Sequence, residues 1–312
     1  MCFHPSEKRL SKFAALSGGV LAVAIAGGFR TAHANMRTPK AAGLTSAASG
    51  AYESTNWSGY ADTASSGYAF NSVSATWTQP AVTTQSSSSY VAASFWVGLD
   101  GFNSSTVEQT GTQAVIGSGG TVSYTAWYEL YPQVEMPVFT VSPGDKISAS
   151  VVYQPSSNEY AFNIQDITSG ASYQITTINS QTASAARSSA EWIVESPEFG
   201  TSSGSYQLAT LPDYGSFGFN NASASITGSH VNQTGSISGV TANNAASLNS
   251  ITLVDGKTFQ ALSTPAALTG NGGAFSTNYT PEPESFALLG GAAAALLPLK
   301  RRKTSGSGRQ VL

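Results

Sequence analysis

The sequence predicts an all-β fold, an antiparallel sandwich or barrel made of many short strands. Apolar and polar residues alternate with a period of two in many short runs, for example at Ile147, Ala149, Val151 and Tyr153. Clusters of Ser, Thr, Gly and Asn separate these runs as turns do, and no run has the spacing of a convincing amphipathic helix. Between the two ends of the chain, roughly 250 residues remain, enough for one large β domain with a sizeable core.

Residues 1–34 are typical of a secretory signal peptide. Three basic residues precede an apolar stretch over residues 13–28, and Ala32-His33-Ala34 provides a cleavage site of the small-x-small type. A retained membrane anchor is the alternative, but the apolar stretch is shorter than the roughly 20 residues of a spanning helix. We therefore expect the protein to be exported and Cys2, the single cysteine, to leave with the signal peptide.

The C-terminal end combines a motif, an apolar run and a basic stop. Pro281-Glu-Pro-Glu-Ser-Phe286 precedes an apolar run up to Leu299 and the cluster Lys300-Arg-Arg-Lys303. This order resembles the PEP-CTERM sorting signal of exopolysaccharide-producing Gram-negative bacteria, which implies an exosortase-type processing enzyme and transient membrane association at the cell surface. An ordinary C-terminal anchor is the alternative. We expect the signal over residues 281–303 and a basic-flanked tail over 304–312.

Three parts are expected between these ends. Residues 35–53 are small and polar and predict an unstructured prosegment or linker, and residues 264–280 predict a flexible linker to the sorting tail. The folded domain is expected over residues 54–263.

The charge of the central part excludes one class of partner. Residues 53–280 hold three basic and fourteen acidic residues, for a formal net charge of −11. Nucleic acid is therefore not expected to bind. A chain with so few basic residues gains little positive charge when its carboxylates protonate, so the composition suits an acidic environment. A generic secreted β-protein kept soluble by negative charge is the alternative.

The inventory of reactive side chains is short. The histidines are His4, His33 and His230, so the exported protein would keep only His230 and no thiol. This excludes Ser-His-Asp and Cys-His catalysis and a zinc site with nitrogen or sulfur ligands. We expect no metal or cofactor, and we expect His230 to be an ordinary loop residue. Carboxylates, amides, hydroxyls and aromatic rings remain for chemistry.

Two predicted strands each place an aromatic ring and a carboxylate on one face. Alternation along residues 91–100 gives Val91, Ala93, Phe95, Val97 and Leu99 to the core face and leaves Ser94, Trp96, Gly98 and Asp100 on the other. The same count over residues 124–131 groups Thr125, Trp127, Glu129 and Tyr131. Such faces favour a groove for an extended ligand. Ordinary sandwich faces with half-buried aromatics are the alternative.

A third strand, over residues 190–195, carries two further acids. Glu191, Ile193 and Glu195 share one face and Trp192 and Val194 the other. A carboxylate beside Ile193 would be partly desolvated, which shifts its pKa. A solvated surface glutamate is the alternative.

Six blocks follow one another in the order found in a known family. They are Asn56-Trp57-Ser-Gly, Ala75-Thr-Trp77-Thr-Gln-Pro80, Phe95-Trp96-Val-Gly-Leu-Asp100-Gly, Glu108-Gln109-Thr-Gly, Ala126-Trp127-Tyr-Glu129-Leu-Tyr131-Pro and Ala190-Glu-Trp-Ile-Val-Glu195. Together they resemble the glutamic peptidases, or eqolisins (peptidase family G1), and the chain looks like a bacterial member. The resemblance extends over about residues 56–254.

The resemblance implies a fold, an activity and a set of site residues. The fold is a β-sandwich of two large antiparallel sheets, bent so that a concave cleft holds the polypeptide substrate. The catalytic pair falls on Gln109 and Glu195. The positions that line the substrate cleft fall on Trp57, Trp96, Asp100, Trp127, Glu129 and Tyr131.

The implied mechanism uses one acid and one amide. Glu195 would take a proton from a water that attacks the peptide carbonyl, and would later protonate the leaving amine. Gln109 would donate a hydrogen bond to the oxyanion, with no covalent intermediate. Activity in strong acid requires hydrogen bonds that favour the carboxylate of Glu195, and Gln109 is one expected donor.

Two other hypotheses accompany this interpretation. The first is latency: Arg37 and Lys40 would lie over the acidic cleft near neutral pH and detach as carboxylates protonate. The second concerns function. A sandwich-fold glycoside hydrolase could use Glu129 and Glu195 as its two catalytic carboxylates. A carbohydrate-binding matrix protein of the biofilm surface would need no catalytic carboxylate. A glycoside hydrolase would not require Gln109.

Overall fold

The computed structural model describes residues 36–281, apart from residues 85, 87, 89, 118, 178–184 and 229–231. The chain divides into residues 1–34 and residues 35–312, and the described part belongs to the second unit. The expected signal peptide, His230 and nearly all of the expected sorting signal and tail lie outside the described residues. Among the helices of the described part, none is long and apolar enough to span a membrane.

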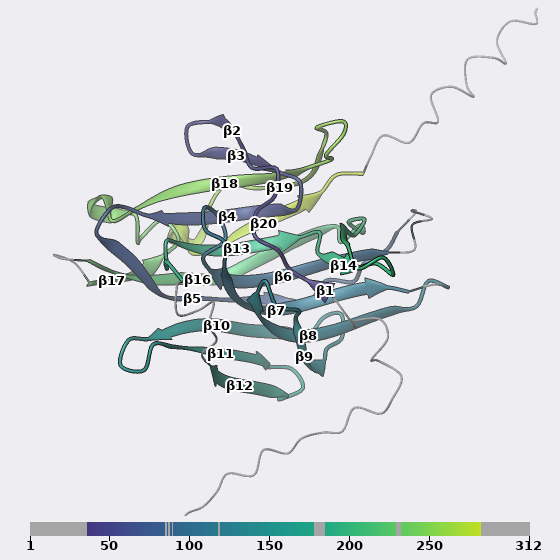
Figure 1. Ribbon diagram of the computed structural model, residues 1–312, viewed down its shortest axis with the longest axis horizontal. Helices are drawn as coiled ribbons and strands as arrows, with labels where there is room; N and C mark the ends of the chain where they lie inside the picture. The colour runs from purple at the N-terminus through teal and green to yellow at the C-terminus, as the bar shows by residue number, and fades with distance from the viewer. Residues whose placement is uncertain are drawn as a thin grey trace, which may run out of the picture. The chain divides into compact units, whose positions relative to one another are not determined.

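The predicted all-β antiparallel architecture is confirmed (Figure 1). In the described part, the helical elements are two short 3₁₀ turns, η2 (Ala242–Asn244) and η3 (Gly270–Gly272). The strands are β1 (Met36–Arg37), β2 (Thr45–Ala48), β3 (Ala51–Ser54), β4 (Trp57–Ala64), β5 (Tyr68–Thr78), β6 (Val91–Leu99), β7 (Val107–Ile116), β8 (Val122–Tyr131), β9 (Met136–Thr140), β10 (Lys146–Gln154), β11 (Glu159–Asp166), β12 (Ser172–Thr177), β13 (Ser189–Glu195), β14 (Glu198–Gly200), β15 (Tyr206–Leu208), β16 (Ser216–Gly228), β17 (Asn232–Ser236), β18 (Ala246–Val254), β19 (Ala261–Pro265) and β20 (Phe275–Tyr279).

The main sheet has 17 strands, and 14 of them form two runs. The other three are β3, which pairs with β18, β2, which pairs with β3, and β17, which pairs with β16. The first run has the order β9-β8-β7-β6-β13-β4-β18 and the second the order β12-β11-β10-β5-β16-β20-β19. Strand β18 also pairs with β19, so the two runs are hydrogen-bonded to each other there. Strands β5, β10 and β11 of the second run contact β6, β7 and β13 of the first, which places a core between them.

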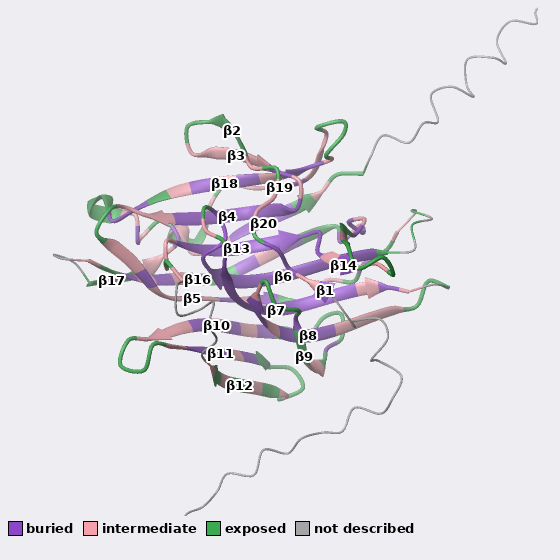
Figure 2. Cartoon of the chain, viewed as in Figure 1, coloured by how far each residue is buried: buried purple, intermediate pink, exposed green. Residues whose placement is uncertain are grey.

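The main core lies between the two runs and follows the predicted alternation. All five residues assigned to the core face of β6 are buried in it: Val91, Ala93, Phe95, Val97 and Leu99. Trp192 and Val194 of β13 join the same cluster. Figure 2 shows the burial concentrated in the central strands, whereas β2 at the margin is exposed. The opposite face of β4, β6, β7, β8 and β13, called here the site face, carries a second buried cluster.

Gly111 allows Trp96 to lie across β7. The two residues are direct partners in the pairing of β6 with β7. A Cβ atom at Gly111 would lie 2.5 Å from Cβ of Trp96 and 2.3 Å from the carbonyl oxygen of Phe95, which is closer than atoms can approach. A side chain at residue 111 would therefore displace Trp96 from the site face.

The expectation that residues 264–280 form a flexible linker is wrong. Strand β20 pairs with β16 and with β19, and Phe275 and Thr277 are buried. The segment is polar in composition, but Phe275, Thr277 and Tyr279 alternate on one face, and that face is covered by the sheet.

The described part of the expected prosegment, residues 36–53, is also more ordered than expected. Strand β3 pairs parallel with β18 and antiparallel with β2, and β1 pairs with β14 in a small separate sheet with β15. These are long-range pairings that the composition of the segment did not indicate.

Candidate active site

Seven of the eight predicted site residues, all except Asp100, lie on or at the edge of the site face. Trp57, Trp96 and Trp127 are fully buried in its apolar cluster, against which Tyr131 packs. The rings of Trp57 and Trp96 meet edge to face at 5.0 Å between centroids. Gln109 pairs with Glu129 across β7 and β8. The alternation of β6 and β8 therefore brings the predicted aromatic residues together with carboxylate and amide groups.

Glu195 ends β13 and is held by two donors. Its Oε1 accepts a hydrogen bond from Nδ2 of Asn56 at 3.1 Å, and its Oε2 accepts one from Nε1 of Trp96 at 2.9 Å. The side chain is fully buried, and burial raises its pKa well above the ordinary value, with the charge of Glu129 adding to the rise. The two hydrogen bonds act in the opposite direction because they stabilise the carboxylate. The burial expected for a carboxylate on the face of Ile193 is observed.

Gln109 does not supply the hydrogen bond to Glu195 that the sequence led us to expect. Its Nε2 donates instead to the carbonyl oxygen of Thr38 at 2.6 Å and to Oε2 of Glu129 at 3.1 Å. The donors that favour the carboxylate of Glu195 are Trp96 and Asn56. The reason is register: the neighbour of Gln109 on β8 is Glu129, which captures the amide.

Glu129 accepts three hydrogen bonds on one oxygen. Besides Gln109, the donors to its Oε2 are the backbone nitrogen of Thr38 at 3.0 Å and the hydroxyl of Thr38 at 2.5 Å. Burial raises the pKa of Glu129 well above its ordinary value, and the charge of Glu135 adds to this, whereas Thr38 and Arg37 lower it. Glu129 therefore fixes both the amide of Gln109 and the main chain of Thr38.

Residues 36–42, called here the strap, cross the site face. The carbonyl of Pro39 accepts from Nε1 of Trp57 at 2.9 Å, and the carbonyl of Lys40 accepts from Nδ2 of Asn56 at 3.1 Å. The nitrogen of Ala42 donates to Oδ1 of Asn56 at 2.7 Å. The strap is thus held through its main chain, in the way an extended peptide of any sequence would be held.

The two cations of the strap behave differently. Arg37 forms an ion pair with Glu198 at 2.9 Å and lies over the ring of Tyr206, whereas the side chain of Lys40 is exposed. The expectation that cations lie over acidic groups is therefore met by Arg37 alone.

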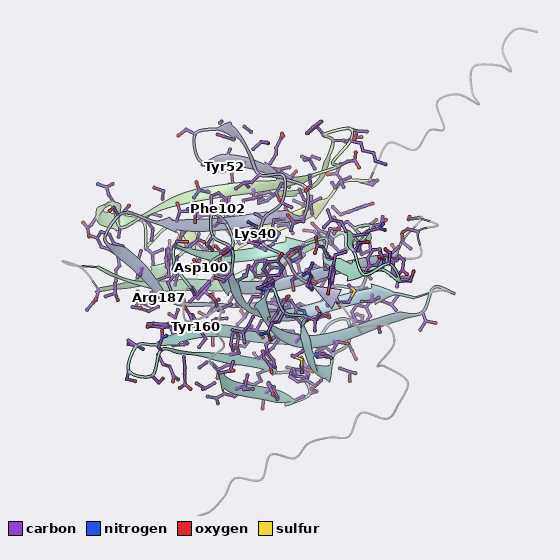
Figure 3. All side chains as sticks on the ribbon, viewed as in Figure 1. Lys40, Tyr52, Asp100, Phe102, Tyr160 and Arg187 are labelled. Atoms are coloured by element: carbon purple, nitrogen blue, oxygen red, sulfur yellow. The ribbon has the colours of Figure 1, made fainter. Side chains whose placement is uncertain are left out.

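Asp100 serves a loop and makes no hydrogen bond with the catalytic candidates. Its carboxylate accepts from the backbone nitrogens of Arg187 at 2.7 Å and Ser188 at 2.8 Å, and from the hydroxyl of Ser188. Figure 3 shows Asp100 and Arg187 next to one another. Its φ of 70° ends β6 in the left-handed region. The carboxylate therefore anchors the segment that leads into β13.

Two residues of the site escaped the sequence-based assignment. Asn56 joins Glu195 to the strap, and Thr38 joins Gln109 to Glu129. Asn56 stands directly before Trp57 in the first sequence block, so its position was a usable signal. Thr38 lies outside every block, and its role depends on contacts more than 70 residues away in sequence.

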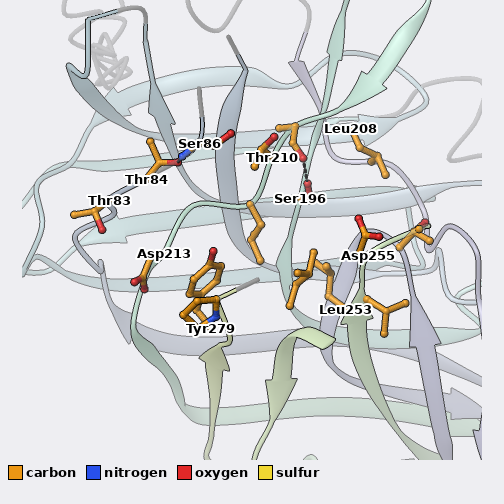
Figure 4. A pocket seen from close by; sticks show the side chains of 17 residues that line it. Thr83, Thr84, Ser86, Ser196, Leu208, Thr210, Asp213, Leu253, Asp255 and Tyr279 are labelled. Atoms are coloured by element: carbon orange, nitrogen blue, oxygen red, sulfur yellow. Dashed lines mark hydrogen bonds between the residues drawn. The ribbon is translucent and has the colours of Figure 1, made fainter. Parts of the chain in front are cut away.

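A separate pocket of about 600 Å³ begins beside Ser196, the residue after Glu195 (Figure 4). Its acids are already engaged in turns, because Asp213 accepts from the nitrogen of Gly215 and Asp255 from those of Lys257 and Thr258. None of the predicted site residues lines it.

Comparison with known proteins agrees with these features. The Peptidase A4 family model matches residues 55–261. Aspergillopepsin-2 of Aspergillus niger is 37% identical over 142 residues, which cover 45% of this chain and 48% of that protein. Scytalidopepsin B of Scytalidium lignicola is 34% identical over 139 residues, covering 44% and 50% respectively. The matched part thus spans about half the length of these two relatives.

Solved structures extend the likeness. Scytalido-glutamic peptidase, solved with a peptide-based transition state analogue, superimposes with a TM-score of 0.58 at 25% identity, over 72% of this chain and 98% of that one. SCP-B, a member of the eqolisin family solved with the tripeptide Ala-Ile-His, shares the fold with a TM-score of 0.57 at 24% identity. The chain therefore belongs to the Peptidase A4 family, the eqolisins or glutamic peptidases.

Proposed function

We propose that the protein is an acid endopeptidase that cleaves peptide bonds with a water activated by Glu195 and an oxyanion stabilised by Gln109. One observation carries the proposal: a peptide carbonyl, that of Thr38, lies 2.6 Å from Nε2 of Gln109. An oxyanion donor must stand at this distance from the oxygen that becomes charged. The strap thus models how a peptide enters the site.

The catalytic cycle follows from what each group can do. With a substrate in place of the strap, the Glu195 carboxylate takes one proton from a bound water, and the oxygen of that water attacks the peptide carbonyl carbon. The negative charge moves to the carbonyl oxygen, where the amide of Gln109 donates to it. Glu195 then returns the proton to the nitrogen, the C–N bond breaks, and an acid and an amine leave. No bond to the enzyme forms.

The surrounding residues hold these groups in place. Trp96 and Asn56 fix the two oxygens of Glu195, and Glu129 orients the amide of Gln109. Trp57 donates to the carbonyl of Pro39, one residue beyond the carbonyl at Gln109, and so would bind the substrate main chain on the leaving-group side. Preorganised groups of this kind account for much of the rate enhancement of hydrolytic enzymes.

With the strap in the site, the enzyme would be latent. The strap fills the site, and burial raises the pKa of Glu195, which disfavours the carboxylate that has to act as the base. The peptide bond whose carbonyl lies at Gln109 joins Thr38 to Pro39. The nitrogen of this bond belongs to the proline ring and carries no hydrogen.

Release of the strap would have to break the ion pair between Arg37 and Glu198.

The remaining features concern the cellular location of the protein. We propose export by the signal peptide over residues 1–34 and surface sorting of a bacterial enzyme through the PEP-CTERM-like segment over residues 281–303, with processing by an exosortase-type enzyme and transient membrane association. A glycoside hydrolase and a carbohydrate-binding matrix protein are not favoured, because membership of the Peptidase A4 family points to peptides as substrate.

The proposal is tested by incubating the acid-treated full chain with a denatured protein at acidic pH in the presence of pepstatin. We expect pepstatin-resistant cleavage that is lost in Gln109→Ala and in Glu195→Ala. A wild-type protein that cleaves nothing across acidic pH, after release of residues 36–42, would contradict the proposal.

A further inference from the structure

Arg37 of the strap occupies a site built from three strands. Its guanidinium pairs with Oε2 of Glu198 on β14 at 2.9 Å and lies 3.2 Å from the ring centroid of Tyr206 on β15 and 5.6 Å from that of Tyr131 on β8. A carboxylate and two aromatic rings around one planar cation provide an ion pair and cation–π contacts together.

The main chain of the occupant is bound as an added strand. Met36 and Arg37 form β1, which pairs antiparallel with β14, with Arg37 directly opposite Glu198. Opposite charges on facing residues of an antiparallel pair stabilise that register. An incoming peptide can pair with the same edge, because strand addition uses backbone groups that every peptide has.

The register relative to the catalytic pair is defined. The carbonyl at Gln109 belongs to Thr38, so Arg37 is the residue immediately before the one whose carbonyl would be attacked. Residues 53–280 hold only three basic residues, and the cation in this site comes from the occupant.

Building on the proposed endopeptidase activity, we infer that Glu198, Tyr206 and Tyr131 form a specificity subsite for a cationic side chain, arginine above lysine, one residue before the residue that donates the scissile carbonyl. Arginine is preferred because only a planar guanidinium can stack on Tyr206 while it pairs with Glu198. The substrate class is therefore peptides with a basic residue at that position, and the strap is the chain's own example.

The first test compares two peptides that differ only at this position, with arginine or its neutral isostere citrulline before a Thr-Ala bond. We expect kcat/KM for the arginine peptide to be about tenfold higher with the acid-treated full chain. Glu198→Gln should bring the two peptides within about twofold, whereas Glu159→Gln, a matched acid on β11, should keep the preference. A third peptide carries lysine at this position, and Tyr206→Leu should remove the preference for arginine over lysine. Equal rates in the wild type, or an unchanged ratio in Glu198→Gln, would overturn the inference.

The second test requires no catalysis. The full-length variant Arg37→Gln, with a weakened strap, is titrated with a fluorescent peptide Met-Arg-Thr-Pro-Lys-Ala and with its citrulline form, and binding is read as anisotropy. Tighter binding of the arginine form without cleavage of any peptide would support the subsite and refute the peptidase. Cleavage without discrimination would refute the subsite and leave the peptidase standing. Failure of both binding and cleavage would refute both.

Discussion

The side-chain amide of Gln109 donates a 2.6 Å hydrogen bond to the main-chain carbonyl of Thr38, a residue 71 positions earlier in the chain. The same amide is fixed from the other side by Glu129, at 3.1 Å. A carbonyl held in this way has the position that a substrate carbonyl needs, so the contact connects the N-terminal segment to the proposed chemistry.

Removing the Glu129 carboxylate, which accepts a hydrogen bond from Gln109, should slow the reaction without weakening substrate binding to the same degree. In Glu129→Ala the amide loses its fixed orientation, and misplacement of a catalytic group costs on the order of 10²-fold in rate. We expect kcat for a peptide substrate to fall and KM to change little. A variant with unaltered kcat would show that Glu129 does not position Gln109.

The full chain should become more active when the strap loses its ion pair. Arg37→Gln removes the contact with Glu198 and the stacking on Tyr206, so the strap is expected to leave the site more often, with activity on a small peptide rising roughly tenfold. Lys40→Gln is the control, because the Lys40 side chain is exposed, and should behave as wild type. Equal initial rates for Arg37→Gln and wild type would argue against latency through this pair.

Stability should be greatest in moderate acid. Burial raises the pKa of Asp62, Glu108 and Glu191 well above their ordinary values, and the charge of Asp100 adds to the rise at Glu108 and Glu191. The folded state therefore binds these protons more tightly than the unfolded state does. Their contribution is complete below about pH 4 and is lost as the pH rises towards their folded pKa values, by about 1 kcal/mol or more for each carboxyl.

Urea unfolding between pH 3 and pH 7 measures this trend. Asp166 and Asp255 have pKa values lowered by the hydrogen bonds that they accept, and they act in the other direction, but only as the pH falls below about 4. Glu191→Gln should flatten the loss above pH 4, and Glu159→Gln should not. A free energy of unfolding that rises from pH 4 to pH 7 would contradict the assignment.

A methyl group at residue 111 should damage both stability and activity. Gly111→Ala would bring Cβ to 2.5 Å from Cβ of Trp96, and overpacking of this kind costs about 1–3 kcal/mol. Displacement of Trp96 would also remove a donor from Glu195. Gly117→Ala, just after β7, is the matched control, since its Cβ would meet only the carbonyl of Thr121 at 3.6 Å. Equal thermal midpoints for the two variants would refute the packing argument.

The sequence was most informative where strands are long and regular. Alternation along β6 separated Phe95 in the main core from Trp96 on the site face, and both assignments hold. It failed for β20, where Ser, Thr and Asn hide a strand whose partner, β16, begins about 60 residues earlier. Local composition does not record such long-range pairings.

In the site, too, the sequence predicted some features and missed others. Motif order placed the aromatic residues, Gln109 and Glu195 correctly on one face, but the donors to Glu195 and the path of the strap depend on contacts between distant segments. Asp100 illustrates the limit: its carboxylate was expected in the cleft, yet it binds the backbone of Arg187 and Ser188.

The most direct test of the central claim is the rate of peptide cleavage by four single variants at acidic pH, each checked for folding by thermal unfolding. Gln109→Ala should lower kcat by about 10²- to 10³-fold, and Glu195→Gln by at least about 10²-fold. Gln113→Ala and Glu191→Gln are matched controls. Gln113 lies on the strand of Gln109, and its amide donates hydrogen bonds to Ser94 and Glu135. Glu191 lies on the strand of Glu195. Both controls should retain activity within about tenfold of wild type. Full activity in Gln109→Ala or Glu195→Gln, or equal losses in the controls, would contradict the proposed roles of this pair.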